Sequence, residues 1–127
     1  MATQLIDTAI LVDLLRGNTL AKSWLDGQPQ GVAAISVVTV AELLAGCRNQ
    51  GEQKAVEMEL GLYPVLWLSE SISQLAITWY GKYHLSHGVG FLDCLIGATA
   101  SLNHLELCTL NEKHFRPLPQ IQLLRPY

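Results

Sequence analysis

The chain has 127 residues, half of them hydrophobic and 15% charged, which suits one compact domain over residues 1–127 and excludes intrinsic disorder. No apolar run reaches the roughly 18 residues of a membrane span, and the N-terminus lacks the basic leader and cleavage site of a signal peptide, so we expect a cytoplasmic protein. Because the net charge is −3, the chain has no overall attraction to nucleic acid, and a polyanion would have to bind through a local patch or through bound cations.

The first part of the chain predicts one strand and two helices. Gln4–Ile6 has the pattern of a short strand, and Asp7 is placed to cap a helix that continues through Ala9–Arg16. The glycine that follows is expected to end this helix. A second helix covers about Thr19–Asp26.

A second strand, two helices and a third strand follow. Val32–Ile35 is a short, partly β-branched apolar run typical of a buried strand, and Ser36 is placed to cap a helix over Val37–Cys47. The polar stretch Glu52–Leu60 favours a helix. Val65–Leu68 has the composition of a third strand.

The last part of the chain continues this alternation. Ser69 or Ser71 opens a helix that runs to about Tyr83, and a glycine-containing loop, Leu85–Gly90, precedes a helix over Phe91–Asn103. The remaining predicted elements are a fourth strand, a turn or short helix, and an edge strand: Leu105–Leu110, Asn111–Phe115 and Ile121–Leu124. The alternation predicts an α/β fold around a mainly parallel sheet of four to five strands.

Three of the eleven acidic residues lie where solubility does not explain them. Asp7 has a simple structural interpretation as a helix cap, and Glu42 could face water or pair with Arg48. Asp93 lies in an apolar helix, Phe91–Asn103, where the helix dipole stabilises a carboxylate by only ~0.3–1 kcal/mol. Burying an ion costs several kcal/mol, so structure alone explains Asp93 poorly.

The joint pattern of these acids is more informative than any one of them. Asp7 directly follows a predicted strand, Asn111 follows another, and Glu42 lies early in the helix after the second strand. In parallel α/β sheets ligands bind at the carboxyl ends of the strands, so all of these residues and Asp93 are candidates for one edge of the sheet. Several carboxylates held together repel unless a cation neutralises them, and oxygen ligands select Mg²⁺ or Mn²⁺.

Other chemistries find no support in the sequence. The spacing of the four histidines matches no zinc motif, which favours surface or capping roles for them. The chain contains no GxSxG elbow, no GxxxxGK[ST] phosphate loop and no GxGxxG fingerprint.

Four segments of the chain resemble the PIN-domain family, and specifically the VapC toxins of bacterial type II toxin–antitoxin systems. In chain order the segments read IDTAILVDLLRG, ISVVTVAELLAG, FLDCLIGATA and LCTLNEKHF. The resemblance implies a three-layer α/β/α domain with a twisted parallel sheet, and an acidic metal site that hydrolyses RNA phosphodiester bonds. It also implies a small antitoxin as partner and a homodimer.

Carried over by position, Asp7 and Asp93 match the main Mg²⁺ carboxylates of the family, and Glu42 matches the acid in the helix after the second strand. The fourth position, an aspartate in many PIN nucleases, is Asn111 here. An asparagine supplies a carbonyl oxygen but no charge, so a second ion should bind more weakly. Toxins that resemble this chain do carry asparagine at this place.

The leading hypothesis is therefore a Mg²⁺-dependent endoribonuclease, with Mn²⁺ able to replace Mg²⁺. Asp7, Glu42, Asp93 and Asn111 would be its catalytic residues, and Asp7 and Asp93 its main metal ligands, with Glu42 and then Asn111 as further ligands. The basic residues expected to contact the RNA backbone are Arg16, Lys113 and Arg116.

Two alternatives stay open from the sequence. One is a catalytically degenerate PIN module that binds RNA or a protein partner, which the neutral Asn111 favours and the three retained acids disfavour. The other is a nuclease that acts on DNA or flap structures, which the short chain disfavours.

Overall fold

The computed structural model describes the whole chain, residues 1–127, as five strands and seven helices. The strands are β1 (Gln4–Ile6), β2 (Ala33–Ser36), β3 (Val65–Leu66), β4 (Glu106–Cys108) and β5 (Gln122–Leu124). The helices are α1 (Thr8–Leu15), α2 (Thr19–Asp26), α3 (Val37–Ala45), α4 (Gln50–Leu60), α5 (Glu70–His87), α6 (Phe91–Leu102) and α7 (Glu112–Phe115).

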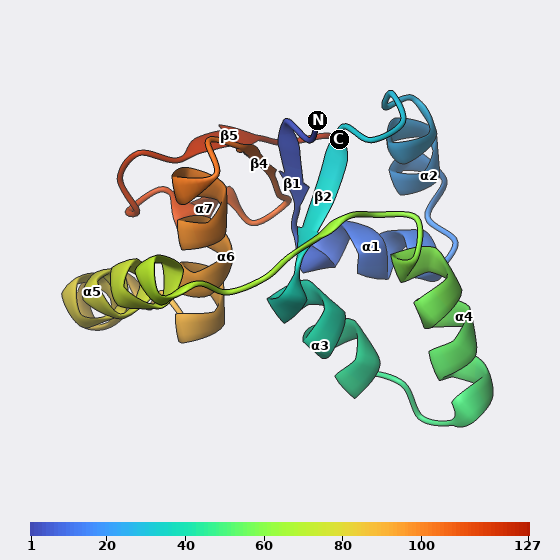
Figure 1. Cartoon of the computed structure of the whole chain (residues 1–127), viewed down its shortest axis with the longest axis horizontal. Coiled ribbons are helices and arrows are strands. Elements are labelled where there is room, and N and C mark those ends of the chain that lie inside the picture. Colours follow the sequence, from blue (N-terminus) through green and yellow to red (C-terminus); the bar gives the residue numbers. More distant parts are fainter.

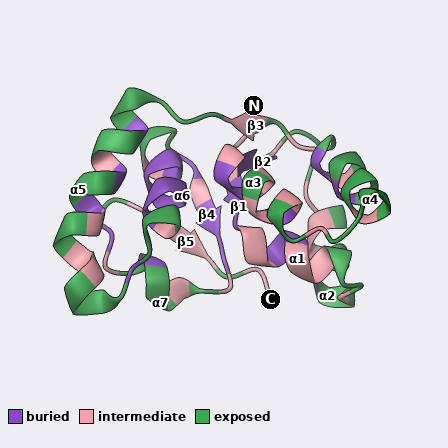
Figure 2. Cartoon of the chain, turned by 90° about the horizontal axis from the view of Figure 1, so that it is seen from below, coloured by how far each residue is buried: buried purple, intermediate pink, exposed green.

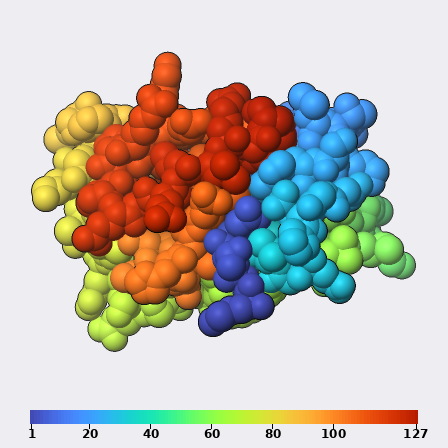
Figure 3. All heavy atoms as spheres, turned by 90° about the horizontal axis from the view of Figure 1, so that it is seen from above, coloured from blue at the N-terminus to red at the C-terminus, as the bar shows by residue number.

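The five strands form one sheet in the order β3-β2-β1-β4-β5, and every neighbouring pair is parallel. β1 is the central strand: Gln4 pairs with Ala33 of β2 and with Glu106 of β4. Figure 3 shows the first residues of the chain, in blue, between the cyan segment around β2 and the orange and red C-terminal segments. The predicted α/β fold is confirmed, and β5 is an edge strand as expected.

Helices cover both faces of this sheet and make a three-layer α/β/α fold. Helices α1 to α4 lie on one side and α5 to α7 on the other (Figures 1 and 2). The side chains of successive strand residues pack against the helices on opposite faces of the sheet. Leu5 and Leu107 pack with α5 and α6, whereas Ile6 and Cys108 pack with α1, α3 and α4. The core therefore lies on both faces of β1 and β4, and it fixes the carboxyl ends of these two strands.

The helix starts follow the predicted caps closely. The side chains of Asp7, Ser36 and Ser69 each accept a hydrogen bond from a backbone N–H in the first turn of α1, α3 and α5. These caps start two of the helices directly after a strand, so α1 begins at the end of β1 and α3 at the end of β2.

Several predicted boundaries were wrong. Helix α5 runs to His87 instead of Tyr83 and ends at Gly88, whose φ of 66° is the left-handed conformation that suits glycine, so little of the predicted loop remains. α4 begins at Gln50, ahead of Glu52, because the Asn49 side chain caps it. The predicted strands Val65–Leu68 and Leu105–Leu110 shorten to β3 and β4.

Helix α6 approaches its neighbours closely at Gly97. A Cβ atom there would lie 2.9 Å from the Ile121 side chain and 3.0 Å from the Leu118 side chain, closer than packed carbon atoms allow. The small residues of α6 therefore let the helix that carries Asp93 sit tightly against the C-terminal segment. None of the helices is both long and apolar enough to cross a membrane.

Candidate acidic site at the carboxyl edge of the sheet

Asp7 is a buried carboxylate at the carboxyl end of β1, with only 4% of its surface exposed. Its Oδ1 accepts a hydrogen bond from the Thr8 N–H (2.8 Å), and its Oδ2 accepts one from the Thr109 hydroxyl (2.7 Å). Thr109 directly follows β4, the neighbouring strand. Both carboxylate oxygens are thus fixed by residues from two adjacent strand ends.

Glu42 of α3 is tied to the start of α1 by a threonine. The Thr8 hydroxyl donates to Glu42 Oε1 (2.8 Å) and also lies 2.9 Å from the hydroxyl of Thr39, which is fully buried. Since the single Thr8 proton points to Glu42, Thr39 is the donor to Thr8. This chain of hydroxyls orients one oxygen of Glu42 and leaves the other without a protein partner.

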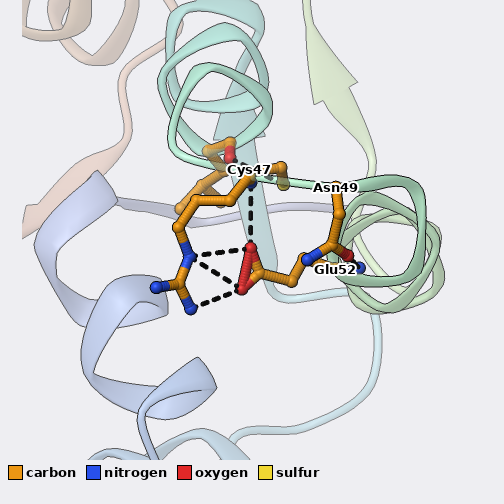
Figure 4. A network of polar contacts seen from close by, with 5 residues as sticks. Cys47, Asn49 and Glu52 are labelled. Carbon is orange, nitrogen blue, oxygen red and sulfur yellow. Dashed lines mark hydrogen bonds and ion pairs between the residues drawn. The ribbon is translucent and has the colours of Figure 1, made fainter.

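The alternative pairing of Glu42 with Arg48 is wrong. Arg48 instead binds Glu52: its Nη2 lies 2.9 Å from one carboxylate oxygen, and its backbone N–H donates to the other. Figure 4 shows this network at the α3–α4 corner, together with Asn49, whose side chain accepts from the Glu52 N–H. Because the chain turns after α3 ends at Ala45, Arg48 points toward α4.

Asp93 lies in the first turn of α6 with 30% of its side chain exposed. Its Oδ2 is 3.2 Å from His114 Nδ1, a contact across to α7. Burial raises the pKa of Asp93, and the nearby His114 acts to lower it. The sequence predicted only a surface or capping role for His114. Its imidazole is exposed, but it also contacts Asp93, a candidate metal ligand.

The charges of Asp93 and Glu42 both act on Asp7. Burial raises the pKa of Asp7, the hydrogen bonds from Thr109 and Thr8 act to lower it, and the charges of Asp93 and Glu42 raise it further. No three side chains of the His, Cys, Asp and Glu types lie close enough to form a ready-made metal cluster. The three acids offer oxygen ligands, which fit a hard divalent cation, and such a cation would relieve the repulsion between them.

Asn111 lies beside this site but contacts it through its backbone. Its N–H donates to the Thr109 hydroxyl (2.9 Å), the same hydroxyl that donates to Asp7. The Asn111 side chain makes no hydrogen bond and borders a cavity of about 270 Å³. The structure thus brings Asn111 to the predicted edge, within reach of solvent.

The three predicted RNA-contacting residues fall in two separate places. Lys113 and Arg116 border the cavity beside Asn111. Arg16 borders a different cavity of about 540 Å³, between α1, α3 and α4, which Glu42 also lines.

The sequence reasoning missed the residues that hold the acids in position. These are the three threonines Thr8, Thr39 and Thr109, and His114. Thr109 lay inside the predicted strand Leu105–Leu110, and only the shorter β4 of the structure places it at the strand end beside Asp7. Thr39 and His114 carried no signal, since only the tertiary fold brings them to Thr8 and Asp93.

Comparison with known proteins places the chain in a family. Residues 5–118 match the PIN domain model. The ribonuclease VapC10 of Mycobacterium tuberculosis is 38% identical over 124 residues, which cover 96% of this chain and 90% of the relative. Ribonuclease VapC19 of the same species is 35% identical over 125 residues, which cover 94% of this chain and 97% of the relative.

Solved structures agree in fold over nearly the whole chain. A chain of a toxin–antitoxin complex from Klebsiella pneumoniae superimposes with a TM-score of 0.81 at 31% identity and covers 98% of both chains. The DNA-bound VapBC structure from Salmonella typhimurium gives a TM-score of 0.86 at 19% identity and covers 100% of both chains, which supports the fold alone. The chain belongs to the PIN domain family and, within that family, to the VapC ribonucleases.

Proposed function

We propose that this chain is a Mg²⁺-dependent endoribonuclease that acts as the toxin of a type II toxin–antitoxin system. The observation that carries the proposal is the buried carboxylate of Asp7, fixed by Thr8 and Thr109 and subject to the charges of Asp93 and Glu42. A fold has little structural reason to bury such a group among like charges, whereas a metal site requires it. The VapC relatives, named as ribonucleases, support the same chemistry.

Asp7 and Asp93 would hold the ion, with Glu42 as a third ligand. When bound, Mg²⁺ lowers the pKa of a water molecule and polarises the phosphate of the substrate. The oxygen of Glu42 that Thr8 leaves free would orient the attacking water and accept its proton. Thr109 would keep Asp7 in the orientation needed for binding, and the Asn111 amide would contact the substrate or the ion's outer shell.

We further propose a small antitoxin as partner and a homodimer as the assembled form. Related structures are toxin–antitoxin complexes, which supports the first of these. The cavity of about 540 Å³ that Arg16 and Glu42 line is a suitable place for an antitoxin segment, because one of the proposed catalytic acids, Glu42, borders it. Large exposed apolar side chains such as Trp67, Ile77 and Leu85 are available for a dimer interface. The protein would act in the cytoplasm, where its RNA substrate is found.

The direct test is cleavage of a structured RNA by the purified chain, with Mg²⁺ and with EDTA. We expect cleavage that requires the metal and that is lost in Asp93→Asn. Cleavage in EDTA, or full activity of Asp93→Asn, would contradict the proposal.

A second candidate is a PIN module that binds RNA or a protein partner without catalysis. The neutral Asn111 at the fourth acidic position favours this alternative. It predicts RNA binding by the wild-type chain without Mg²⁺-dependent cleavage, so the cleavage assay together with a binding assay separates the two functions.

A further inference from the structure

The carboxyl edge of the sheet carries opposite charges at its two ends. Two of the acids lie over β1 and β2: Asp7 directly follows β1, and Glu42 is on the helix that follows β2. Over β4 and β5 the same edge carries cations that border the cavity of about 270 Å³: Lys113, Arg116 and Arg125. Three of the eight lysines and arginines in the chain thus surround one small cavity.

Arg125 directly follows β5 and is held in place by two backbone oxygens. Its Nη1 donates to the Leu110 carbonyl (3.0 Å), and its Nε donates to the terminal oxygen of Tyr127, the last residue of the chain (3.1 Å). No Asp or Glu side chain pairs with it, unlike Arg48, whose guanidinium is bound to Glu52. The guanidinium is therefore held in place by backbone oxygens, and its Nη2 is left without a protein partner.

The other two cations add to this charge to different extents. Lys113 is exposed and makes no ion pair, whereas Arg116 Nη2 lies 3.2 Å from the Glu112 carboxylate. Six of the seven residues that line the cavity are polar or charged, and the one acid among them, Glu112, is paired with Arg116, so the cavity has little to offer an apolar ligand. An anion is the ligand that this lining would recognise.

Lining and position narrow the choice of ligand. Pockets for organic molecules are lined mainly by apolar and aromatic side chains, whereas only Leu110 is apolar here, so the cavity suits a phosphate group better than a nucleoside. None of Asp7, Glu42 and Asp93 lines it, so the phosphate that is cleaved would lie elsewhere. Asn111 and His114 border the cavity and also contact Thr109 and Asp93, which makes the two sites neighbours.

We propose that this basic cavity binds a backbone phosphate of RNA next to the one that is cleaved, with Arg125 and Lys113 as its main contacts. The inference rests on the proposed ribonuclease function. It means that the RNA strand runs from the acidic site toward α7 and the end of β5. It also explains how an acidic chain holds a polyanion, since a local patch of three cations lies directly beside the proposed metal site.

The test measures binding in EDTA, where no cleavage occurs, of a short synthetic single-stranded RNA to the full chain at several salt concentrations. Arg125→Gln and Lys113→Gln should each weaken binding about tenfold, as expected for a lost charge-assisted contact. The slope of log K against log salt should fall by about 0.7 for each phosphate contact removed. Lys54→Gln is the matched control: it removes the same charge from an exposed, unpaired lysine on α4 and should leave affinity and slope almost unchanged.

Equal losses in Lys54→Gln and in the two cavity variants would overturn the proposal, because they would reflect net charge alone. Unchanged binding in Lys113→Gln and Arg125→Gln would overturn it too, as would a wild-type chain that does not bind the RNA. The Lys113 side chain makes no hydrogen bond or ion pair that its replacement could break, so its variant guards against a folding defect in Arg125→Gln. A chain that binds RNA through these residues but does not cleave it with Mg²⁺ would contradict the ribonuclease function and leave the phosphate site supported.

Discussion

The two sides of the acidic site are built differently. On one side Asp7 and Glu42 are held by the hydroxyls of Thr109 and Thr8 at 2.7 and 2.8 Å, in buried or partly buried surroundings. On the other side Asp93 is 30% exposed and has one contact, at 3.2 Å, with an exposed histidine. One half of the site is thus fixed by the fold and the other is free to adjust when an ion or a substrate arrives. Mutations in the two halves should therefore have unequal effects.

The largest expected effect is that of Asp7→Asn in the fixed half. RNA cleavage should fall on the order of 1,000-fold or more, because a ligand charge is lost where nothing can replace it. In EDTA, by contrast, the free energy of unfolding of Asp7→Asn should be higher than that of the wild type. Burial raises the pKa of Asp7, so the folded state binds this proton more tightly than the unfolded state, and the ionised carboxylate lowers the free energy of unfolding at neutral pH.

Denaturation in EDTA and a cleavage assay measure the two effects of Asp7→Asn. The penalty of the ionised carboxylate is absent below the unfolded pKa of about 3.9, so the stability advantage of the variant should grow as pH rises from about 4. Asp26→Asn, an exposed site on α2, is the control and should leave cleavage unchanged. Loss of stability in Asp7→Asn together with retained cleavage would show that the residue is only a helix cap.

Thr109→Val should have the next largest effect, through the orientation of Asp7. Removal of the hydroxyl leaves Asp7 Oδ2 and the Asn111 N–H without their partner, which should lower the free energy of unfolding by about 1–3 kcal/mol. Metal affinity should fall about 10- to 100-fold. Thr99→Val is a matched control, because Thr99 is equally buried but donates to the Leu95 carbonyl inside α6. If both variants lose metal affinity equally, Thr109 has no specific role in the site.

Asn111→Asp tests the boundary between the acidic and basic ends of the edge. A new carboxylate beside Thr109 should strengthen the binding of a second divalent ion about tenfold, as measured by calorimetry with Mn²⁺. It should also weaken RNA binding in EDTA, because the negative charge would border the basic cavity. Identical Mn²⁺ isotherms for the variant and the wild type would mean that this position does not take part in metal binding.

His114→Gln in the adjustable half should have the smallest effect. The contact with Asp93 is long and both side chains are partly exposed, so its loss should change metal affinity and cleavage only about two- to fivefold. Cleavage assays and Mn²⁺ titrations of His114→Gln and Thr109→Val, done side by side, would compare the two halves quantitatively. A larger loss of metal affinity in His114→Gln than in Thr109→Val would contradict the view that the Asp7 half is the more firmly fixed one.

The sequence predicted the parts of the site that depend on strand ends. Asp7 directly follows β1 and Asn111 lies in the short loop after β4, and the caps at Asp7 and Ser36 gave the correct helix starts, because these signals are local. The parallel order of the strands followed from the alternation of elements and brought the acids to one edge.

What the sequence could not predict depends on contacts between distant segments. The Thr8–Thr39 contact joins α1 to α3, and the His114–Asp93 contact joins α7 to α6. No local pattern encodes either contact. Arg125 follows the last strand, β5. Its guanidinium reaches the basic cavity only because β5 pairs with β4, and the sequence does not show this pairing.

The most direct test of the metal site is calorimetric titration of Mn²⁺ into the wild-type chain, Asp7→Asn and Asp93→Asn. We expect the wild type to bind one ion with measurable heat, and each variant to bind it at least about tenfold more weakly, because each loses a ligand charge. Titration of Asp26→Asn should reproduce the wild-type isotherm. An absence of Mn²⁺ binding to the wild type, or equal binding by all four proteins, would contradict the assignment of Asp7 and Asp93 as metal ligands.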